Sequence, residues 1–289
     1  MSLLASFFRN PWGRPRWLAV VTTIYIVWSI IPVSIAILFA FNASRSRSNF
    51  TGLSLRWFNG ATGSAFHDEA LRHALLHSLE LAALSVVVAT PLGLFLALGL
   101  QRWRGRGAGL TNLLMLLPLV TPEIVMGVAL LLLFISVFGF IGLGTTAQAI
   151  GQITFSMSYV VVIVRGRLVS IGKDYEEAAA DLGAPPFDAL RRVLLPLLGP
   201  AIVASAAIVF ATSLDDFVIT QYLSNGPDTQ TVPMLLYSVS RGAPTPALNA
   251  VATIALVITI GTLVAAFLVY RRFSSSGGEA ATEIATLDL

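Results

Sequence analysis

Six long apolar runs dominate this chain, and each is long enough to cross a lipid bilayer. A helix rises 1.5 Å per residue, so about 20 apolar residues cover the roughly 30 Å of a bilayer's hydrocarbon core. Only 11% of the residues are charged and 56% are hydrophobic, which is not the balance of a soluble domain. The sequence therefore predicts an all-α membrane protein with six transmembrane helices. The runs lie near residues 17–41, 73–100, 110–138, 145–164, 194–222 and 247–270.

The basic residues predict how these spans are oriented. Of the 18 Lys and Arg residues, 13 lie in the N-terminal arm, the second and fourth connections, and the segment after the last run. Basic residues gather in cytoplasmic loops, so we expect both termini in the cytoplasm. The expected organisation is a cytoplasmic arm over 1–16, a six-helix domain over 17–272 with a cytoplasmic loop at 171–192, and a flexible C-terminal tail over 273–289.

The chain lacks the motifs of several functional classes. It has no cysteine, which excludes thiolate metal sites and cysteine nucleophiles. Gly139 and Gly144 have the separation of a phosphate-binding loop, but Thr145 stands where a lysine is required. His73 and His77 share a helix face, yet zinc needs three or four converging ligands. We expect no catalytic residue, metal or cofactor in this chain. We expect no nucleic-acid partner either, because membrane topology accounts for the basic residues.

One short polar segment, DYEEAAADLGAPPFDALRRVLLP, occupies residues 174–196 in the fourth connection. Asp174 followed by Glu177 is typical of a capping box, which starts a helix. Gly183 is the residue type that ends a helix in the left-handed conformation, and Pro186 is tolerated in the first turn of a second helix. The segment therefore predicts a helix–turn–helix on the cytoplasmic face, and its alanines would let another protein approach closely.

This segment also resembles a known signature. The pattern E-A-A-x3-G-x9-V-x-L-P matches that of permease subunits of bacterial ABC importers, with Val193 in place of isoleucine. The resemblance implies a type I ABC importer permease fold, in which this loop inserts into a separate ATPase subunit. The docking element would be formed by Glu177, Ala178, Ala179 and Gly183.

The same resemblance implies the setting in which the chain works. ATP and magnesium would bind to the partner ATPase and not to this chain. The chain would be a multi-pass protein of the bacterial inner membrane, surrounded by lipid and paired with a second, homologous permease, most often as a heterodimer. A periplasmic binding protein would deliver the substrate.

Among the acidic residues inside the predicted spans, we single out Glu123, Asp215 and Asp216. A charge in hydrocarbon is costly, so such residues mark substrate pathways. Glu123 lies about 13 residues, or roughly 20 Å, from the start of its span, where Pro118 and Pro122 are expected to kink the helix around a cavity. Asp215 and Asp216 would point about 100° apart on a helix, so one of them is expected to face a central path. We find no Lys or Arg inside any predicted span, which favours a cationic substrate.

Aromatic side chains can help to hold an ammonium group through cation–π attraction, at about 0.5–2 kcal/mol each. Packing against neighbouring helices, or anchoring at the membrane interface, is the alternative role for each of them. The candidates are Trp57, Phe210, Phe217, Tyr222 and Tyr237.

Three further segments resemble spermidine/putrescine permeases. The first, residues 213–253, carries S-L-D-D, then a G-P turn and P-x-x-N-A. The second, LVTPEIVMGVALLLLF, resembles the third span of that family, with Glu123 where an acid is expected. The third, SLRWFNG, resembles its outer loop around Trp57. The resemblance implies polyamine import, with Trp57, Glu123, Glu177 and one of the two aspartates influencing passage.

Two alternatives stay open. An ABC permease for another cationic solute would keep the same acids, and only the pattern of residues 213–253 argues against it. An ion-coupled secondary transporter would use the carboxylates as proton sites. That class usually has inverted repeats, which we do not find here, and it needs no docking loop. The sequence does not decide between putrescine and spermidine.

Overall fold

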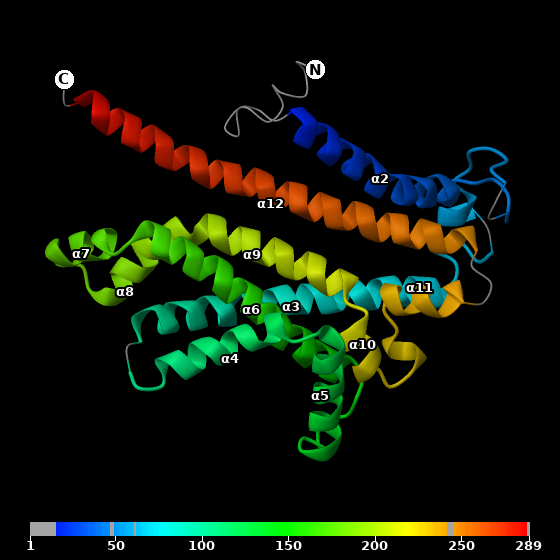
Figure 1. Cartoon of the computed structure of the whole chain (residues 1–289), viewed down its shortest axis with the longest axis horizontal. Coiled ribbons are helices and arrows are strands. Elements are labelled where there is room, and N and C mark those ends of the chain that lie inside the picture. The colour runs from blue at the N-terminus through cyan, green and yellow to red at the C-terminus, as the bar shows by residue number, and fades with distance from the viewer. Residues whose placement is uncertain (1–15, 47–48, 61, 104, 242–244, 288–289) are drawn as a thin grey trace, which may run out of the picture. The chain divides into compact units, whose positions relative to one another are not determined.

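The computed structural model describes residues 16–46, 49–60, 62–103, 105–241 and 245–287 (Figure 1). Apart from one isolated antiparallel bridge between Asn42 and Leu53, this described part is all-α. The α-helices are α2 (Arg16–Ala40), α3 (Glu69–Arg102), α4 (Ala108–Val120), α5 (Glu123–Ser136), α6 (Thr145–Ile171), α7 (Asp174–Asp181), α8 (Pro186–Ala189), α9 (Leu195–Asp215), α10 (Val218–Leu223), α11 (Val232–Ser240) and α12 (Pro246–Leu287). Three short turns complete the set, the π-helical η1 (Arg56–Gly60) and η2 (Leu190–Leu194) and the 3₁₀ turn η3 (Pro227–Thr229).

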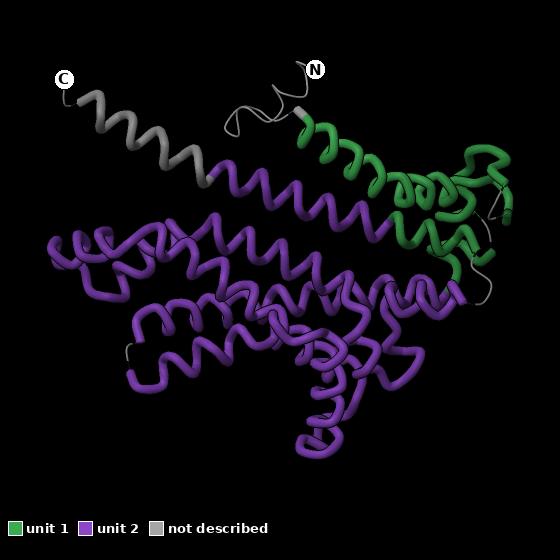
Figure 2. Tube along the Cα trace, viewed as in Figure 1, with its two compact units in different colours: residues 1–68, 244–253 green, residues 69–243, 254–289 purple. Residues whose placement is uncertain are grey.

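The chain divides into two compact units (Figure 2). The first comprises residues 1–68 and 244–253, and the second comprises residues 69–243 and 254–289. Among the candidate residues named above, Trp57 belongs to the first unit and all the others belong to the second.

Within the described residues, five helical segments are long and apolar enough to cross a membrane. They are Trp17–Ala40, Glu69–Arg102, Thr145–Ile171, Pro186–Asp215 and Pro246–Arg272. The number becomes six if α4 and α5 together form one crossing. The expected cytoplasmic arm, residues 1–16, lies outside the described residues except for Arg16. Helix α12 continues to Leu287, so it extends through most of the predicted tail, whose flexibility stays a prediction.

The third predicted span is not one helix. Helices α4 and α5 meet at an angle of 111°, and Figure 1 shows α5 turned away from α4. A proline disfavours helical backbone at the residue before it, and Thr121, which precedes Pro122, is accordingly extended with ψ of 131°. The kink expected at Pro122 is therefore a complete break, after which a new helix begins at Glu123.

The core of the second unit is formed by α3, α6 and α9, which make the most extensive helix–helix contacts. Val160 and Val164 of α6 pack with Leu94 of α3 and Leu198 of α9 in one buried cluster. Helices α3 and α6 are in close contact at Gly93, where an added Cβ would lie 2.6 Å from the Cβ of Val160. A second buried cluster, which includes Leu130 of α5, Ala147 of α6 and Ile219 of α10, joins the bent helix to this core.

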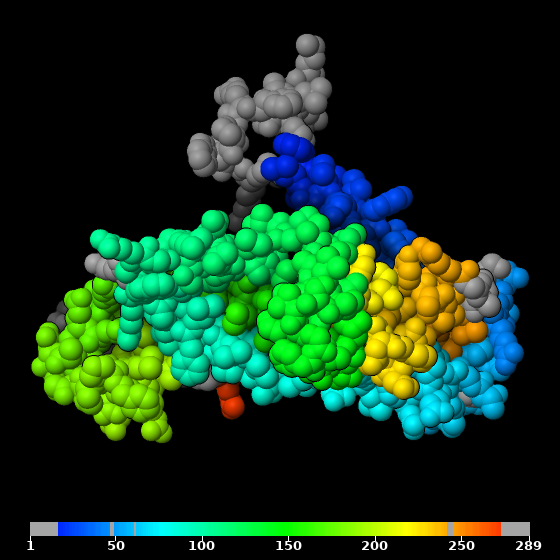
Figure 3. Space-filling model, turned by 90° about the horizontal axis from the view of Figure 1, so that it is seen from below, coloured from blue at the N-terminus to red at the C-terminus, as the bar shows by residue number. Residues whose placement is uncertain are grey.

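Large apolar side chains stay exposed on helices of both units. On α5, Ile124 and Ile135 are each 59% exposed, and Figure 3 shows α5 standing out from the face seen there. Trp28 on α2 is 75% exposed and Phe267 on α12 is 57% exposed. Surfaces of this kind are stable only against lipid or another protein chain, which agrees with a membrane-embedded protein.

We expect Gly93→Ala to destabilise the protein by about 1–3 kcal/mol, because the new methyl group must push α6 away from α3. Gly99→Ala is the matched control, since Gly99 lies on the same helix and has no heavy atom within 4 Å of an added Cβ. The midpoint of thermal unfolding should fall for Gly93→Ala only. Equal midpoints for the two variants would show that this helix contact is not tight.

Candidate functional site

The three acids singled out from the sequence lie around one cavity. Glu123, Asp215 and Asp216 all line it, although Glu123 is more than 90 residues away from the aspartates in the chain. The cavity volume is about 110 Å³, which is small beside the roughly 300–1,000 Å³ of ordinary ligand pockets. Its lining residues are Glu123, Gln152, Phe155, Ser156, Tyr159, Thr212, Ser213, Asp215, Asp216 and Ile219.

Each of these acids lies at a helix break. Glu123 is the first residue of α5, Asp215 is the last residue of α9, and Asp216 is extended with ψ of 115°. Helix α10 begins two residues later, at Val218. The expectation that the two aspartates point 100° apart on one continuous helix is therefore wrong, because the helix ends between them.

The two aspartates have different surroundings. One carboxylate oxygen of Asp216 accepts from the backbone N–H of Ile219 at 3.1 Å. The other accepts from the backbone N–H of Thr220 and from the side-chain amide of Gln152, both at 3.1 Å. Asp216 thus caps the start of α10. Asp215 is exposed, as is Glu123, and among the described residues neither carboxylate has a hydrogen-bond or ion-pair partner.

None of the Lys and Arg residues that the structure describes lines this cavity. Basic residues do occur inside a helix that could span the membrane, because α6 runs to Ile171 and not to residue 164 as expected. Arg165 donates to the side-chain oxygen of Asn112 at 2.6 Å, and Arg167 donates to the carbonyl of Leu197 at 3.4 Å. Both lie in the last two turns of α6, outside the cavity lining, so the cavity itself is acidic.

Like Phe217, the other aromatic candidates lie outside the cavity lining. The ring of Tyr222 packs on Gly127 of α5, where an added Cβ would be 2.7 Å from the ring. Tyr237 is in contact with Phe217 at 4.7 Å between ring centroids, and the Arg241 guanidinium lies 4.5 Å above its ring. Phe210 is half-buried on α9 and does not line the cavity. These three side chains pack against other parts of the second unit or stand outside the cavity.

Trp57 lies in the first unit. It is 2% exposed, and its indole N–H donates to the carbonyl of Asn42 at 2.7 Å. The guanidinium of Arg56 lies 5.0 Å from its ring. Within that unit, Trp57 therefore anchors the turn around residues 42–57.

The aromatic walls of the cavity are two residues that sequence reasoning missed. Phe155 and Tyr159 of α6 stand edge to face, with 5.4 Å between ring centroids. Gln152, Ser156 and Tyr159 recur at intervals of four and three, which is the spacing of one helix face. This polar stripe on an otherwise apolar helix is the sequence feature that could have identified the cavity-lining face of α6.

The segment expected to be the cytoplasmic loop forms the predicted helix–turn–helix. At the end of α7 the N–H of Gly183 donates to the carbonyl of Ala180 at 2.8 Å, and the N–H of Ala184 donates to the carbonyl of Ala179 at 3.0 Å. This is the Schellman arrangement, and Gly183 adopts the required positive φ of 82°. Helix α8 begins at Pro186 as expected. The capping box is not formed, because Asp174 already lies inside the helix and no side chain caps its start.

The exposed surface of this hairpin differs from the expected one. Ala179 is only 8% exposed, because α7 packs against η2, whereas Glu177 and Ala178 are exposed. Two apolar side chains stand out, Leu182 at 89% and Phe187 at 68% exposure. The face that another protein could contact therefore combines a carboxylate with apolar groups.

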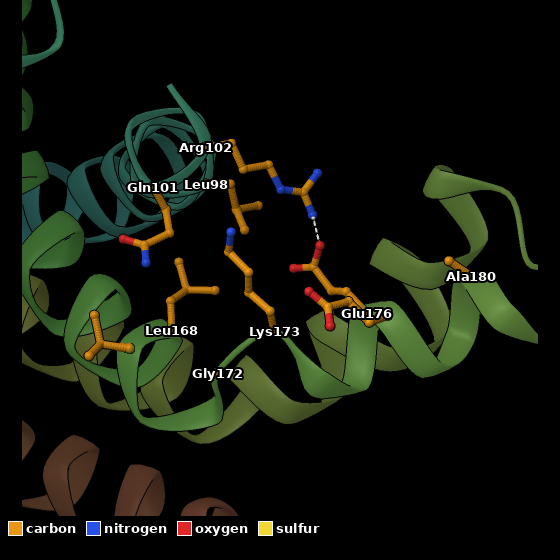
Figure 4. A pocket seen from close by; sticks show the side chains of 10 residues that line it. Leu98, Gln101, Arg102, Leu168, Gly172, Lys173, Glu176 and Ala180 are labelled. Atoms are coloured by element: carbon orange, nitrogen blue, oxygen red, sulfur yellow. Dashed lines mark hydrogen bonds and ion pairs between the residues drawn. The ribbon is translucent and has the colours of Figure 1, made fainter. Parts of the chain in front are cut away.

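A pocket of about 490 Å³ lies between the hairpin and the ends of α3 and α6 (Figure 4). Arg102 at the end of α3 and Glu176 of α7 face one another there, with 2.7 Å between the guanidinium nitrogen and the carboxylate oxygen. The pair is partly exposed, so it contributes little to stability. It does connect the hairpin to the end of a long core helix.

Among the described residues, no group of three or more His, Asp or Glu side chains converges as a metal site requires. His73 and His77 stack with ring centroids 6.2 Å apart, and the Nε2 atom of His77 is hydrogen-bonded to Gln148 at 3.0 Å.

Comparison with known proteins gives consistent matches. The family model described as "binding-protein-dependent transport system inner membrane component" matches residues 89–276. The chain is 35% identical over 259 residues to the spermidine/putrescine transport system permease protein PotC of Shigella flexneri, which covers 89% of this chain and 95% of that protein. It is 34% identical over 251 residues to the putrescine transport system permease protein PotI of Escherichia coli strain K12, covering 85% and 88%.

A solved structure has the same fold. It is a chain of a bacterial ABC transporter involved in the import of the acidic polysaccharide alginate, with a TM-score of 0.71 and 18% identity. The match covers 94% of this chain and 99% of that chain. At this identity the match concerns the fold alone, and it confirms the expected all-α ABC importer permease fold.

We expect Gly183→Val to open the hairpin, because a β-branched residue at positive φ is strained by about 1–2 kcal/mol. The space around an added Cβ is empty, so the effect is conformational and not steric. Gly183→Asn is the matched control, since asparagine tolerates this conformation. Trypsin cleavage at Lys173, Arg191 and Arg192 should be about 5–30-fold faster in Gly183→Val and near the wild-type rate in Gly183→Asn. Similar rates in both variants would argue against the role of the positive φ.

Proposed function

This chain belongs to the family of binding-protein-dependent transport system inner membrane components, and from that premise we propose that it imports polyamines. It is the multi-pass permease subunit of a bacterial ABC importer for the putrescine and spermidine class, located in the inner membrane. The two polyamine permeases to which it is similar over most of its length support this cargo. The alternatives are another cationic solute or an ion-coupled transporter.

The observation that carries the proposal is the acidic cavity. Within the described part of the chain, the exposed carboxylates of Glu123 and Asp215 have no partner, and no Lys or Arg lines the cavity with them. A polyamine is a flexible chain of ammonium groups separated by methylenes. Carboxylates attract each ammonium, and the rings of Phe155 and Tyr159 add cation–π attraction and apolar contact for the methylenes. A few sparse charges also allow release, which conduction requires.

The acids have separate roles in this proposal. Glu123 and Asp215 contact the ammonium groups, because their carboxylates have no other partner among the described residues. Asp216 stabilises the helix break instead of contacting the cargo, because its carboxylate already accepts hydrogen bonds from three donors. Phe210, Tyr222 and Tyr237 support the helices of the second unit that form the path, and Trp57 stabilises the first unit. None of these side chains lines the cavity. Their rings pack against neighbouring residues of their own unit, and the indole N–H of Trp57 donates to a backbone carbonyl.

The rest of the path requires a second subunit. A cavity of about 110 Å³ accepts one end of a polyamine and not its whole length. A homologous permease, most simply a non-identical one, supplies the other wall and covers exposed apolar helix surface. A periplasmic polyamine-binding protein delivers the cargo.

The hairpin of α7, α8 and η2 is the docking element for the ATPase subunit, which binds ATP and magnesium and hydrolyses the nucleotide. Glu177, Ala178, Leu182 and Phe187 supply the contact surface. Gly183 holds the turn, and Ala179 packs the hairpin internally. Through the ion pair between Arg102 and Glu176, displacement of the hairpin reaches the end of α3.

We expect Glu123→Gln and Asp215→Asn each to raise the KM for putrescine about tenfold or more, because each variant loses a hydrogen bond between charged groups. Glu69→Gln is the control, since it removes a negative charge that does not line the cavity. The KM values of the variants and the control are measured from uptake of labelled putrescine and spermidine into proteoliposomes that contain the complete transporter. Wild-type KM values in both variants would refute the cation-path assignment.

We expect uptake to require ATP and to continue when the proton gradient is collapsed. Uptake driven by a proton gradient without ATP would favour the secondary transporter.

Phe187→Ser should weaken co-purification of the ATPase subunit by removing exposed apolar contact area. Phe140→Ser is the matched control, because Phe140 is 83% exposed but lies in the connection between α5 and α6.

A further inference from the structure

Two buried glutamines lie four residues apart on α6. Gln148 is 0% exposed and Gln152 is 2% exposed. A glutamine side chain has two N–H donors and one oxygen acceptor with two lone pairs, and leaving such groups unpaired in the interior costs about 1–3 kcal/mol each. The hydrogen-bond partners of the two side chains are therefore informative.

Gln152 joins α6 to the break between α9 and α10. Its amide nitrogen donates to the carbonyl of Ser213 at 3.3 Å and to the carboxylate of Asp216 at 3.1 Å. Its oxygen accepts from the hydroxyl of Ser213 at 2.5 Å and from the hydroxyl of Ser85 on α3 at 3.2 Å. Every donor and acceptor site of this amide is occupied.

These contacts replace bonds that the break removes. In a continuous helix the carbonyl of Ser213 would accept from the backbone N–H four residues later, at Phe217. Because α9 ends at Asp215, this carbonyl needs another donor, and Gln152 provides it. The same amide holds the Asp216 carboxylate, which accepts from the first free N–H groups of α10. One side chain therefore satisfies polar groups on both sides of the break.

Gln148 serves the other end of α10 and provides a natural comparison. Its amide nitrogen donates to the carbonyls of Thr220 and Thr229, both at 2.9 Å, and its oxygen pairs with His77 at 3.0 Å. It has the same chemistry and burial as Gln152, but it touches no carboxylate and does not line the acidic cavity.

We infer that Gln152 is a positioning residue of the substrate site: it fixes the helix break and keeps Asp216 bound to α10, which leaves Asp215 directed to the cargo. This inference rests on the proposed function for its consequence in transport. Its consequence for the helix break does not depend on the cargo.

The first experiment compares Gln152→Met with Gln148→Met in the transporter assembled with its ATPase and binding protein. Both variants lose a buried amide, so both should lower the midpoint of thermal unfolding. Only Gln152→Met should raise the KM for putrescine, by about tenfold, because it removes the hydrogen bond that holds the Asp216 carboxylate. The turnover number should change less than KM.

A double-mutant cycle tests whether the effect passes through Asp216. In an Asp216→Asn background, Gln152→Met should change KM less than about twofold further, because coupled residues do not contribute additively. Full additivity of the two changes overturns the inference.

Hydrogen exchange of the α10 amides supplies a measurement that needs no substrate. Exchange at Ile219 and Thr220 should rise about tenfold in Gln152→Met and by clearly less in Gln148→Met, since one hydrogen bond to the cap is lost. Unchanged exchange, or a wild-type KM in Gln152→Met, overturns the inference. A wild-type transporter that no polyamine stimulates overturns the proposed function instead, while the exchange measurement still decides the role of Gln152.

Discussion

A backbone carbonyl or N–H group freed inside a membrane must find its partner within the protein, because hydrocarbon offers none. The second unit depends on this constraint at the end of α9. There the Ser213 carbonyl and the first N–H groups of α10 lose their helical partners, and Gln152 and Asp216 replace them. Since these replacements come from side chains on α6 and on the chain between the helices, the break has one defined geometry.

That geometry gives the three acids different hydrogen-bond partners. A carboxylate that accepts three hydrogen bonds, as Asp216 does, is held in place and has little capacity left for a passing cation. The neighbouring Asp215, which is the last residue of α9, has no partner among the described residues. The same is true of Glu123, which follows the break at Pro122. Two adjacent residues of one type therefore differ in role because one of them stabilises the backbone that presents the other.

Local patterns predicted some features well and others poorly. The turn at Gly183 and the helix start at Pro186 follow from backbone sterics that involve only neighbouring residues, and both were predicted. The aromatic residues of the cavity were not. Phe155 and Tyr159 lie on the helix face that carries the polar stripe, while the aromatic candidates closer to the aspartates in sequence pack elsewhere. Proximity along the chain was a poor guide to proximity in space.

The sequence by itself determined the apolar helices, the hairpin of α7 and α8 and the acids that line the cavity, because hydrophobicity, proline and glycine sterics and the cost of buried charge are properties of single residues and their neighbours. Only the tertiary structure decided that α9 ends at Asp215 and which aspartate is free. Those outcomes rest on contacts such as that between Gln152 and Asp216, which are 64 residues apart in the chain. No local pattern specifies such a pair, since it forms only when α6 packs against the end of α9.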